Sequence, residues 1–481
     1  MKRSEVLFLG LVLVAVFIIV YSPHFNYPFP YHIDEWHQIT KSMNIGNEVR
    51  GIESNFEIGL HFLLFCLSKL TNLVLVYKFL PALWAVLSAL TLFFVVYKKT
   101  GKNFLIALFS VIFFASLKSN VNILGLWFFT PLTFAIPFIF LYIYFFTEGM
   151  EKQNKKLVLI SLGIMVFLIP FHALSVTFSI PILAFYCLFH LKYIKKEYKF
   201  FSLFLIVPLI GIIFYKFVMR KTFLEVLSNL TDLFIFKRGW GILEIQNSFF
   251  EVYSFIGYLL VALGVMLILL HRTDSKKYLV YILWPVITLV SIISFRIFGI
   301  SLFAPYQRNL YYFALSLPFL SAFGLYFIIK IVKNEINNIN INHYQKEIVK
   351  KSVILIIILL LLFFTFRSYY KIPENSSLYQ VITEKDYEDL LYLKGLPNEG
   401  EVMADIMIST ALYPISHKNE VSALFFSIRN RKDVERFFNS NGCEVKNRII
   451  KKQNVSYILS KEPINCNWQL LRSENNYIYQ T

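Results

Sequence analysis

Charged residues are scarce in this sequence. Of its 481 residues, 16% are charged and 57% are hydrophobic, whereas a soluble globular domain carries about 25% charged residues. This deficit excludes an ordinary soluble protein and predicts a membrane protein. Acidic residues are fewer than basic ones, 30 against 47, but the basic residues lie mostly in short loops between apolar runs. That distribution orients a membrane protein, so no nucleic-acid partner is predicted.

Cysteine is also scarce, and four cysteines are too few for a disulfide scaffold. Cys66 and Cys187 fall in apolar stretches and are typical of buried core residues. Cys443 and Cys466 lie in the polar C-terminal part, where they could form a bridge in an oxidising compartment or stay as two free thiols. The N-terminal apolar run ends at Tyr21 without a small-residue cleavage site, which favours a retained anchor. The sequence has no internal repeat and no low-complexity linker.

Long apolar runs follow one another along the first three quarters of the chain. Their lengths approach or match the thickness of a bilayer when they are helical. They predict an α-helical polytopic membrane protein with eleven spans, at 5–22, 74–97, 103–117, 122–147, 156–170, 174–191, 199–219, 250–271, 277–297, 309–332 and 352–367.

One further apolar run, 56–72, is interpreted differently. On a helix, Glu57, His61, Ser68 and Asn72 fall on one narrow face, because offsets of 4, 11 and 15 residues return to nearly the same direction. An apolar helix with one polar stripe suits the membrane surface better than the bilayer interior. We therefore expect a juxtamembrane helix here.

The basic residues support this choice. With eleven spans and a cytoplasmic N-terminus, the inner segments hold 20 Lys and Arg and the outer loops hold 9, as the positive-inside rule requires. A twelfth span at 56–72 would reverse that balance. We expect a multi-pass protein of the cell membrane, with loops 98–102, 192–199 and 330–351 in the cytoplasm and residues 368–481 outside.

Residues 368–481 differ from the rest in composition, with frequent charges, Asn and Ser. Their periodicity predicts helices over 384–396 and 431–442 and strands over 400–406, 420–426 and 454–460. This alternation indicates a small extracytoplasmic α/β domain that follows a transmembrane domain of residues 1–367. The outer loop 23–73 belongs to the transmembrane domain in this division.

Polar side chains gather on the outer side in this topology. They are Asp34 and Glu35 in the first outer loop, His172 at a turn between spans, Lys237 and Arg238 in a long outer loop, and Arg308 at the start of a late span, with Arg296 nearby. A glycosyl transfer from a lipid phosphate needs such groups. A positioned carboxylate takes the proton of the acceptor hydroxyl, and Arg or Lys stabilises the phosphate that leaves. A lipid donor keeps its tail in the bilayer, so base and cations should lie at the interface.

Each of these groups also has a plainer interpretation. The two carboxylates could cap the short helix that begins there, and the basic pair could be solvated. His172 could bond a loop carbonyl, and Arg308 could be an interfacial anchor. His32 and His37 beside the carboxylates resemble a metal site, but no spacing among them is diagnostic, so a divalent cation stays open and no cofactor is assigned.

On these features the sequence resembles the GT-C superfamily of integral-membrane glycosyltransferases, which take sugars from polyprenyl- or dolichyl-phosphate donors. The shared features are an Asp-Glu pair in the first outer loop, a juxtamembrane helix after it, an Arg before a late span and an outer α/β domain. The resemblance covers nearly the whole chain and is one of layout more than of strict motif.

The resemblance implies roles for single residues. Asp34 would activate the acceptor as a base with Glu35 beside it, Arg308 would hold the lipid phosphate, and His172 would line the site. The reaction would invert the anomeric centre and move a hexosyl or pentosyl group to a glycan, lipid or protein acceptor. The C-terminal part has no Trp-Trp-Asp motif, which argues against an oligosaccharyltransferase.

Two other classes compete with this interpretation. A transporter or flippase for a lipid-linked or anionic substrate would place ionisable residues near mid-membrane and show internal repeats, whereas the predicted spans are almost free of charge. A non-catalytic envelope protein would leave the gathering of acids and cations unexplained.

Overall fold

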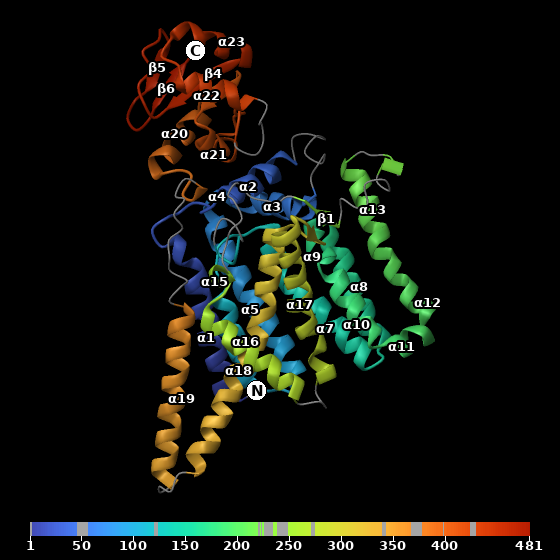
Figure 1. The fold of residues 1–481 in the computed structure, drawn as a ribbon. Helices are drawn as coiled ribbons and strands as arrows, with labels where there is room; N and C mark the ends of the chain where they lie inside the picture. The colour runs from blue at the N-terminus through green and yellow to red at the C-terminus, as the bar shows by residue number, and fades with distance from the viewer. Residues whose placement is uncertain are drawn as a thin grey trace. The chain divides into compact units, whose positions relative to one another are not determined.

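The computed structural model describes most of the chain (Figure 1). The described residues are 2–45, 56–119, 124–219, 222, 224–225, 234–237, 249–270, 275–338, 343–366, 378–397, 399–423 and 430–481. They fall into two compact units. Unit 1 comprises Met1–Ser22, Glu53–Ile58 and Pro81–Ile372, and unit 2 comprises Pro23–Ile52, Gly59–Leu80 and Pro373–Thr481.

Unit 1 is almost entirely helical. Its helices are α1 (Arg3–Tyr21), α5 (Leu80–Lys99), α6 (Phe104–Ala115), α7 (Pro131–Glu151), α8 (Lys155–His172), α9 (Leu174–Thr177), α10 (Ser179–Leu188), α11 (Leu191–Lys196), α12 (Tyr198–Phe201), α13 (Ile206–Met219), α15 (Phe249–Val252), α16 (Phe255–Leu270), α17 (Ser275–Phe298), α18 (Tyr306–Asn338) and α19 (His343–Phe366). The short strands β1 (Ile235–Phe236) and β2 (Ser301–Leu302) form an antiparallel pair.

Each of the eleven apolar runs coincides with one or more of these helices. In the described part of the chain, seven helices are long and apolar enough to cross a membrane, and others are shorter apolar helices. The predicted α-helical polytopic fold is confirmed. The number of crossings stays a prediction, because length and composition alone do not place a bilayer.

Helix α18 is the centre of unit 1 and packs against α6, α16 and α17 (Figure 1). Glycine permits its close crossing with α16. A Cβ atom on Gly264 would lie 2.1 Å from the Leu320 carbonyl oxygen, and one on Gly324 would lie 2.1 Å from that of Leu260. Small residues at a crossing let two helix backbones approach, as in helix pairs that associate within membranes.

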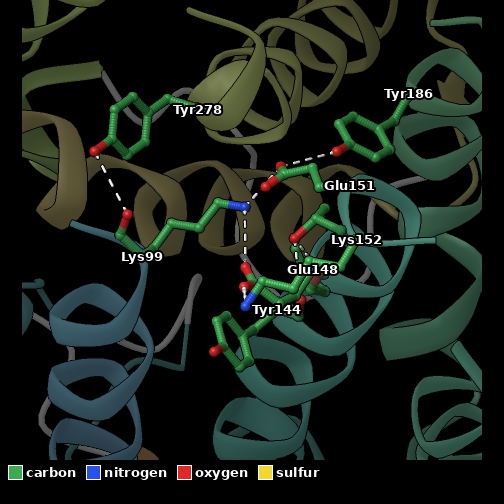
Figure 2. Close-up of polar contacts among 9 residues, drawn as sticks. Lys99, Tyr144, Glu148, Glu151, Lys152, Tyr186 and Tyr278 are labelled. Atoms are coloured by element: carbon green, nitrogen blue, oxygen red, sulfur yellow. Dashed lines mark hydrogen bonds and ion pairs between the residues drawn. The ribbon is translucent and has the colours of Figure 1, made fainter. Parts of the chain in front are cut away.

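A buried group of charges joins α5, α7 and α10 (Figure 2). Lys99 is fully buried, and its Nζ lies 2.7 Å from Glu151 Oε1 and 3.5 Å from Glu148 Oε2. The Tyr186 hydroxyl donates to the same Glu151 oxygen at 3.1 Å, and the exposed Lys152 pairs with Glu148. A buried ammonium keeps its charge only beside such partners, so this ion-pair group fastens three helices at one end.

Unit 2 combines the first outer loop with the C-terminal part. Its helices are α2 (Ile33–Asn44), α3 (Ile58–Leu70), α4 (Leu73–Val76), α20 (Glu384–Lys394), α21 (Ile406–Ser416), α22 (Arg431–Asn439) and α23 (Cys443–Gln453). Its strands are β3 (Glu401–Ala404), β4 (Val455–Ser460), β5 (Gln469–Arg472) and β6 (Tyr477–Gln480), which form one sheet in the order β3-β4-β6-β5. Strand β3 runs parallel to β4, and the other neighbours are antiparallel.

The small C-terminal α/β domain is confirmed, with some differences in its elements. The predicted helix at 384–396 is α20, and the predicted strands at 400–406 and 454–460 are β3 and β4. The predicted helix at 431–442 ends earlier, at Asn439. The described part of the predicted strand 420–426 makes a single bridge, between Val402 and Glu420.

Helix α3 occupies the run 56–72 and has 13 residues. At about 1.5 Å per residue it is roughly 20 Å long, shorter than the apolar core of a bilayer, about 30 Å. Its length agrees with the predicted juxtamembrane helix.

Cys443 and Cys466 form a disulfide bridge, with their Cα atoms 5.7 Å apart. Of the two alternatives that the sequence left open, the structure has the bridge. It ties the start of α23 to the segment before β5.

We expect Lys99→Met to lower the free energy of unfolding by about 3 kcal/mol, because it leaves the partly buried Glu151 carboxylate without its ammonium and Glu148 with only the exposed Lys152. Lys152→Met is the control. Its side chain is 64% exposed, so the change should stay within about 0.5 kcal/mol. Unfolding by denaturant in mixed micelles measures both, and equal stabilities of the two variants would show that the buried ion pairs contribute little.

The topology can be tested with single cysteines at exposed positions in a background without Cys66 and Cys187. Lys102, between α5 and α6, and Lys461, after β4, are both exposed. We expect a membrane-impermeant maleimide to label Lys461→Cys in intact cells, and Lys102→Cys only after permeabilisation. The opposite result would reverse the predicted orientation.

Candidate functional site

Helix α2 carries the acidic pair and is fixed by its own N-terminus. His32 is the N-cap residue, and its Nδ1 accepts the backbone N–H of Asp34. Glu35 Oε2 in turn accepts the backbone N–H groups of Tyr31 at 2.8 Å and His32 at 3.1 Å. Such reciprocal bonds satisfy N–H groups that a helix start otherwise leaves unpaired.

The buried face of α2 packs on the C-terminal part of unit 2. Ile33, Trp36 and Ile39 are buried at three-residue spacing, and α2 contacts α21. The chain before α2 is held to the same part, since the Tyr27 hydroxyl donates to the carbonyl of Ile382 at 3.0 Å. Residues about 350 positions apart in sequence therefore set the position of the acidic pair.

The two carboxylates differ in their surroundings. Glu35 is completely buried, and its bonds to backbone N–H groups give it the capping role that the sequence offered as an alternative. The Asp34 side chain is 30% exposed. His32 Nδ1 lies 3.7 Å from Oδ2, but that nitrogen accepts the Asp34 N–H and so carries no proton that could pair with the carboxylate. Among the described residues, no ion pair with Lys or Arg engages Asp34.

Two histidines lie beside the acidic pair in unit 2. His61, on α3, hydrogen-bonds through Nε2 to Gln38 and so links α3 to α2. Burial lowers the pKa of His61 to about 3, with smaller contributions from His37 and Lys41. Burial likewise lowers the pKa of His37 to about 4, although Asp34 opposes this shift. Both rings are therefore neutral near pH 7.

Arg308 lies in unit 1, in the first turn of α18. It is half-buried, and its Nε is buried without a hydrogen-bond partner. Within the described part of the chain it makes no ion pair and no hydrogen bond. A guanidinium that is partly removed from water and unpaired is costly, and it is suited to bind an anion.

The segment before α18 is held rigidly, which fixes the position of Arg308. The side-chain amide of Asn309 donates to Ser291 Oγ at 2.8 Å, Ser301 Oγ at 2.9 Å and the Ala304 carbonyl at 2.8 Å. Phe303 has a φ of 63°, and its carbonyl accepts the Thr177 hydroxyl at 2.8 Å. Asn309 directly follows the predicted arginine, but an asparagine at this position carries no signal in the sequence.

His172 ends α8 and is joined to α18 by hydrogen bonds. Its Nδ1 lies 2.6 Å from Ser175 Oγ, which lies 3.1 Å from the Tyr312 hydroxyl. Tyr312 follows Arg308 by one helical turn, on the same face of α18, and Arg308 acts electrostatically on His172. The structure thus brings His172 and Arg308 together in unit 1. Neither Ser175 nor Tyr312 carried a signal in the sequence.

The other predicted cations have different environments. Lys237 is exposed and directly follows β1. Strand β1 pairs with β2, which begins five residues before the start of α18. Arg238 lies outside the described residues. Arg296 is less suited than Arg308 to bind an anion, because its guanidinium is already engaged. Its Nε donates to the Tyr306 hydroxyl at 2.9 Å, and the guanidinium lies over the Phe249 ring.

A divalent cation beside His32 and His37 stays a prediction. Among the described residues, no three His, Cys, Asp or Glu side chains are grouped so that they could hold a metal ion.

No protein-family profile matches the sequence, and no curated protein matches it. Solved structures match it in fold. The oligosaccharyltransferase of Archaeoglobus fulgidus, tethered to an acceptor peptide with the NVT sequon, aligns with a TM-score of 0.59 at 12% identity, over 96% of this chain and 69% of that one. The same enzyme in complex with zinc and sulfate aligns with a TM-score of 0.57 at 13% identity, over 94% and 68%.

ArnT from Cupriavidus metallidurans, bound to undecaprenyl phosphate, aligns with a TM-score of 0.57 at 11% identity, over 98% of this chain and 97% of that one. At these identities the likenesses show that this chain shares the fold of the oligosaccharyltransferase and of ArnT. That shared fold agrees with the layout predicted from the sequence.

Stability should fall in acid because of His61. Its ring takes up a proton with an ordinary pKa of 6.5 when unfolded, but only near pH 3 when folded. The free energy of unfolding should therefore drop by up to about 1.4 kcal/mol per pH unit as pH falls from 6.5 toward 3. His61→Gln should flatten the curve of unfolding free energy against pH by that amount. An unchanged slope would contradict the neutral buried ring.

Proposed function

We propose that this protein is an inverting membrane glycosyltransferase. It moves a hexosyl or pentosyl group from a polyprenyl-phosphate-linked donor to an acceptor at the extracytoplasmic face. The observation that carries the proposal is Arg308, a half-buried guanidinium at the start of α18 with no partner among the described residues. The GT-C fold supports it, as does undecaprenyl phosphate in one neighbour and an acceptor peptide in another.

Asp34 is the base in this proposal. Its carboxylate takes the proton of the acceptor hydroxyl while the hydroxyl oxygen forms a bond to the anomeric carbon. Partial exposure, and the absence of a Lys or Arg partner among the described residues, leave it able to do so. Glu35 supports it indirectly, because its capping bonds fix the first turn of α2 and thereby the direction of the Asp34 side chain.

Arg308 acts on the leaving group. As the bond between the anomeric carbon and the phosphate oxygen breaks, negative charge grows on the lipid phosphate, and the guanidinium stabilises it by charge-assisted hydrogen bonds. His172 uses Nδ1 for Ser175 and presents the other edge of its ring to the donor. Lys237 and Arg238 supply further positive charge for the phosphate.

The extracytoplasmic face is supported by the charge balance of the loops and by the disulfide bridge. A bridge between Cys443 and Cys466 persists in an oxidising compartment and is rare in the cytosol. The sugar, the lipid carrier and the acceptor are to be identified by assay.

Arg308→Ala should weaken the binding of a polyprenyl phosphate by about 30-fold or more, roughly 2 kcal/mol, because a half-buried charge pair loses one partner. Arg308→Lys keeps the charge without the fork geometry, so its loss should be smaller. Lys237→Ala should have the smallest effect, less than about 1 kcal/mol, because its ammonium is exposed. Titration of the purified protein with undecaprenyl phosphate measures all three. Equal affinity of wild type and Arg308→Ala would remove Arg308 from the site.

Asp34→Asn should lower the transfer rate by about 10²- to 10⁴-fold, because the amide keeps the shape but cannot accept a proton. Its stability should be nearly that of wild type. Glu35→Gln is the neighbouring control and should lose less, since an amide oxygen can still accept backbone N–H groups. Near-normal transfer by purified Asp34→Asn with a defined lipid donor would defeat the assignment, and a large loss in Glu35→Gln alone would move the base by one residue.

A further inference from the structure

Unit 2 contains a cavity that the proposed reaction does not use. Its volume is about 250 Å³, near the lower end of ligand-sized pockets, about 300 Å³. Its walls come from α2, from the end of α3 and the turn into α4, from α20, and from the end of α21. None of the residues that line it has a role in the transfer described above.

One part of the wall is formed by polar side chains. Thr71, Asn72, Tyr387, Lys394 and His417 line the cavity. Asn72 uses its carbonyl oxygen to cap α4, accepting the N–H of the third residue after it, so its NH₂ group is available. Within the described part of the chain, the Lys394 ammonium and the His417 ring nitrogens have no hydrogen bond or ion pair, and both side chains, like that of Asn72, are exposed. The polar wall is therefore open to solvent, and it offers a ligand donors that no described protein group engages.

The rest of the wall is apolar, and the described lining residues include no carboxylate. Met43, Leu391 and Ile415 are among the apolar side chains. A sugar residue matches such a lining, because its ring has an apolar C–H face and an edge of hydroxyl groups. Since Lys394 is the only permanently charged group among the described lining residues, an anionic sugar is also accepted, whereas a cationic ligand is not.

The backbone at His417 is strained. His417 follows α21 with a φ of 60°, a left-handed conformation that glycine normally fills at the end of a helix. A side chain with a Cβ atom is disfavoured in this conformation, and strain of this kind is found where a side chain is held for function. The neighbouring Lys418 is buried and fixes this helix end, because its Nζ donates to the carbonyls of Leu396 and Pro397 at 2.9 and 2.7 Å.

The protonation state of His417 agrees with recognition of hydroxyl groups. Burial, and to a smaller extent Lys394, lowers the pKa of His417 below its ordinary value. The ring is therefore neutral near pH 7 and offers one donor and one acceptor nitrogen, which is the pairing that a hydroxyl group needs.

We propose that this cavity in unit 2 is a carbohydrate-binding site, which holds one neutral or anionic sugar residue against Asn72, Tyr387, Lys394 and His417. Binding at this site does not depend on the transfer chemistry of Asp34 and Arg308. A failure of either proposal is therefore visible without the other.

The test is saturation-transfer NMR on the full-length protein in lipid nanodiscs with methyl glycosides of glucose, galactose, mannose, N-acetylglucosamine and glucuronic acid. We expect transfer to at least one of them, with a dissociation constant on the order of 1 mM, the range of a single small ligand with few contacts. The Asp34→Asn variant should give the same signals as wild type, which separates this site from the transfer reaction.

Two variants each remove one polar side chain from the wall of the cavity. His417→Gly removes the ring and also relieves the backbone strain, so its melting temperature should equal or exceed that of wild type while its sugar signal falls at least about fivefold. Lys394→Ala should lose a similar share of the signal. Lys385→Ala is the matched control, because Lys385 is exposed on the same helix and does not line the cavity.

Three results would overturn the proposal. They are the absence of any sugar signal with wild type, undiminished signals in both His417→Gly and Lys394→Ala, and binding of inorganic phosphate, seen as ³¹P line broadening, without binding of any sugar. The last result would assign an anion site in place of a carbohydrate site.

Discussion

Burial of charge is the constraint on which unit 1 depends. A charge among membrane-spanning helices is expensive unless a partner of opposite sign lies beside it. Lys99 meets this requirement within the protein, through Glu148 and Glu151 (Figure 2). Arg308 does not meet it with any described residue. The ion pairs of Lys99 therefore fasten helices together, whereas the guanidinium of Arg308, unpaired among the described residues, is suited to bind an anion. This difference is the basis for proposing a lipid phosphate as the ligand of Arg308.

Helix α18 connects the packing of unit 1 to this chemistry. Its crossing with α16 relies on Gly264 and Gly324, and its first turn is held by the amide of Asn309. Tyr312 then reaches Ser175 and, through it, His172. A rigid helix presents the guanidinium, and hydrogen bonds at its start limit how far that group can move, which is what positioning of a phosphate requires. In unit 2 the capping bonds of Glu35 do the same for Asp34.

Much of this architecture could be predicted from the sequence, because long apolar runs form helices and the positions of Asp34 and Arg308 follow from motif and loop order. Other features could not. The segment 406–416 is apolar and short, and such a run does not distinguish a strand from a buried helix; it is α21. Strands β5 and β6 are too short and too polar to show alternation. The adjacent carboxylates of Asp34 and Glu35 look equivalent in the sequence. Only the hydrogen bonds of Glu35 to backbone N–H groups show that Glu35 caps the helix and that Asp34 does not share this role. The union of the first outer loop with the C-terminal part is a long-range contact that no local pattern encodes.

The central claim is that this chain consumes a lipid-linked sugar. The most direct measurement compares lipid extracts and surface glycans from cells with and without the protein, by mass spectrometry. The account predicts that one polyprenyl-phosphate-linked sugar accumulates when the protein is absent, while one class of surface glycan loses that same sugar. Identical lipid-linked sugars and identical glycans in the two extracts would contradict it.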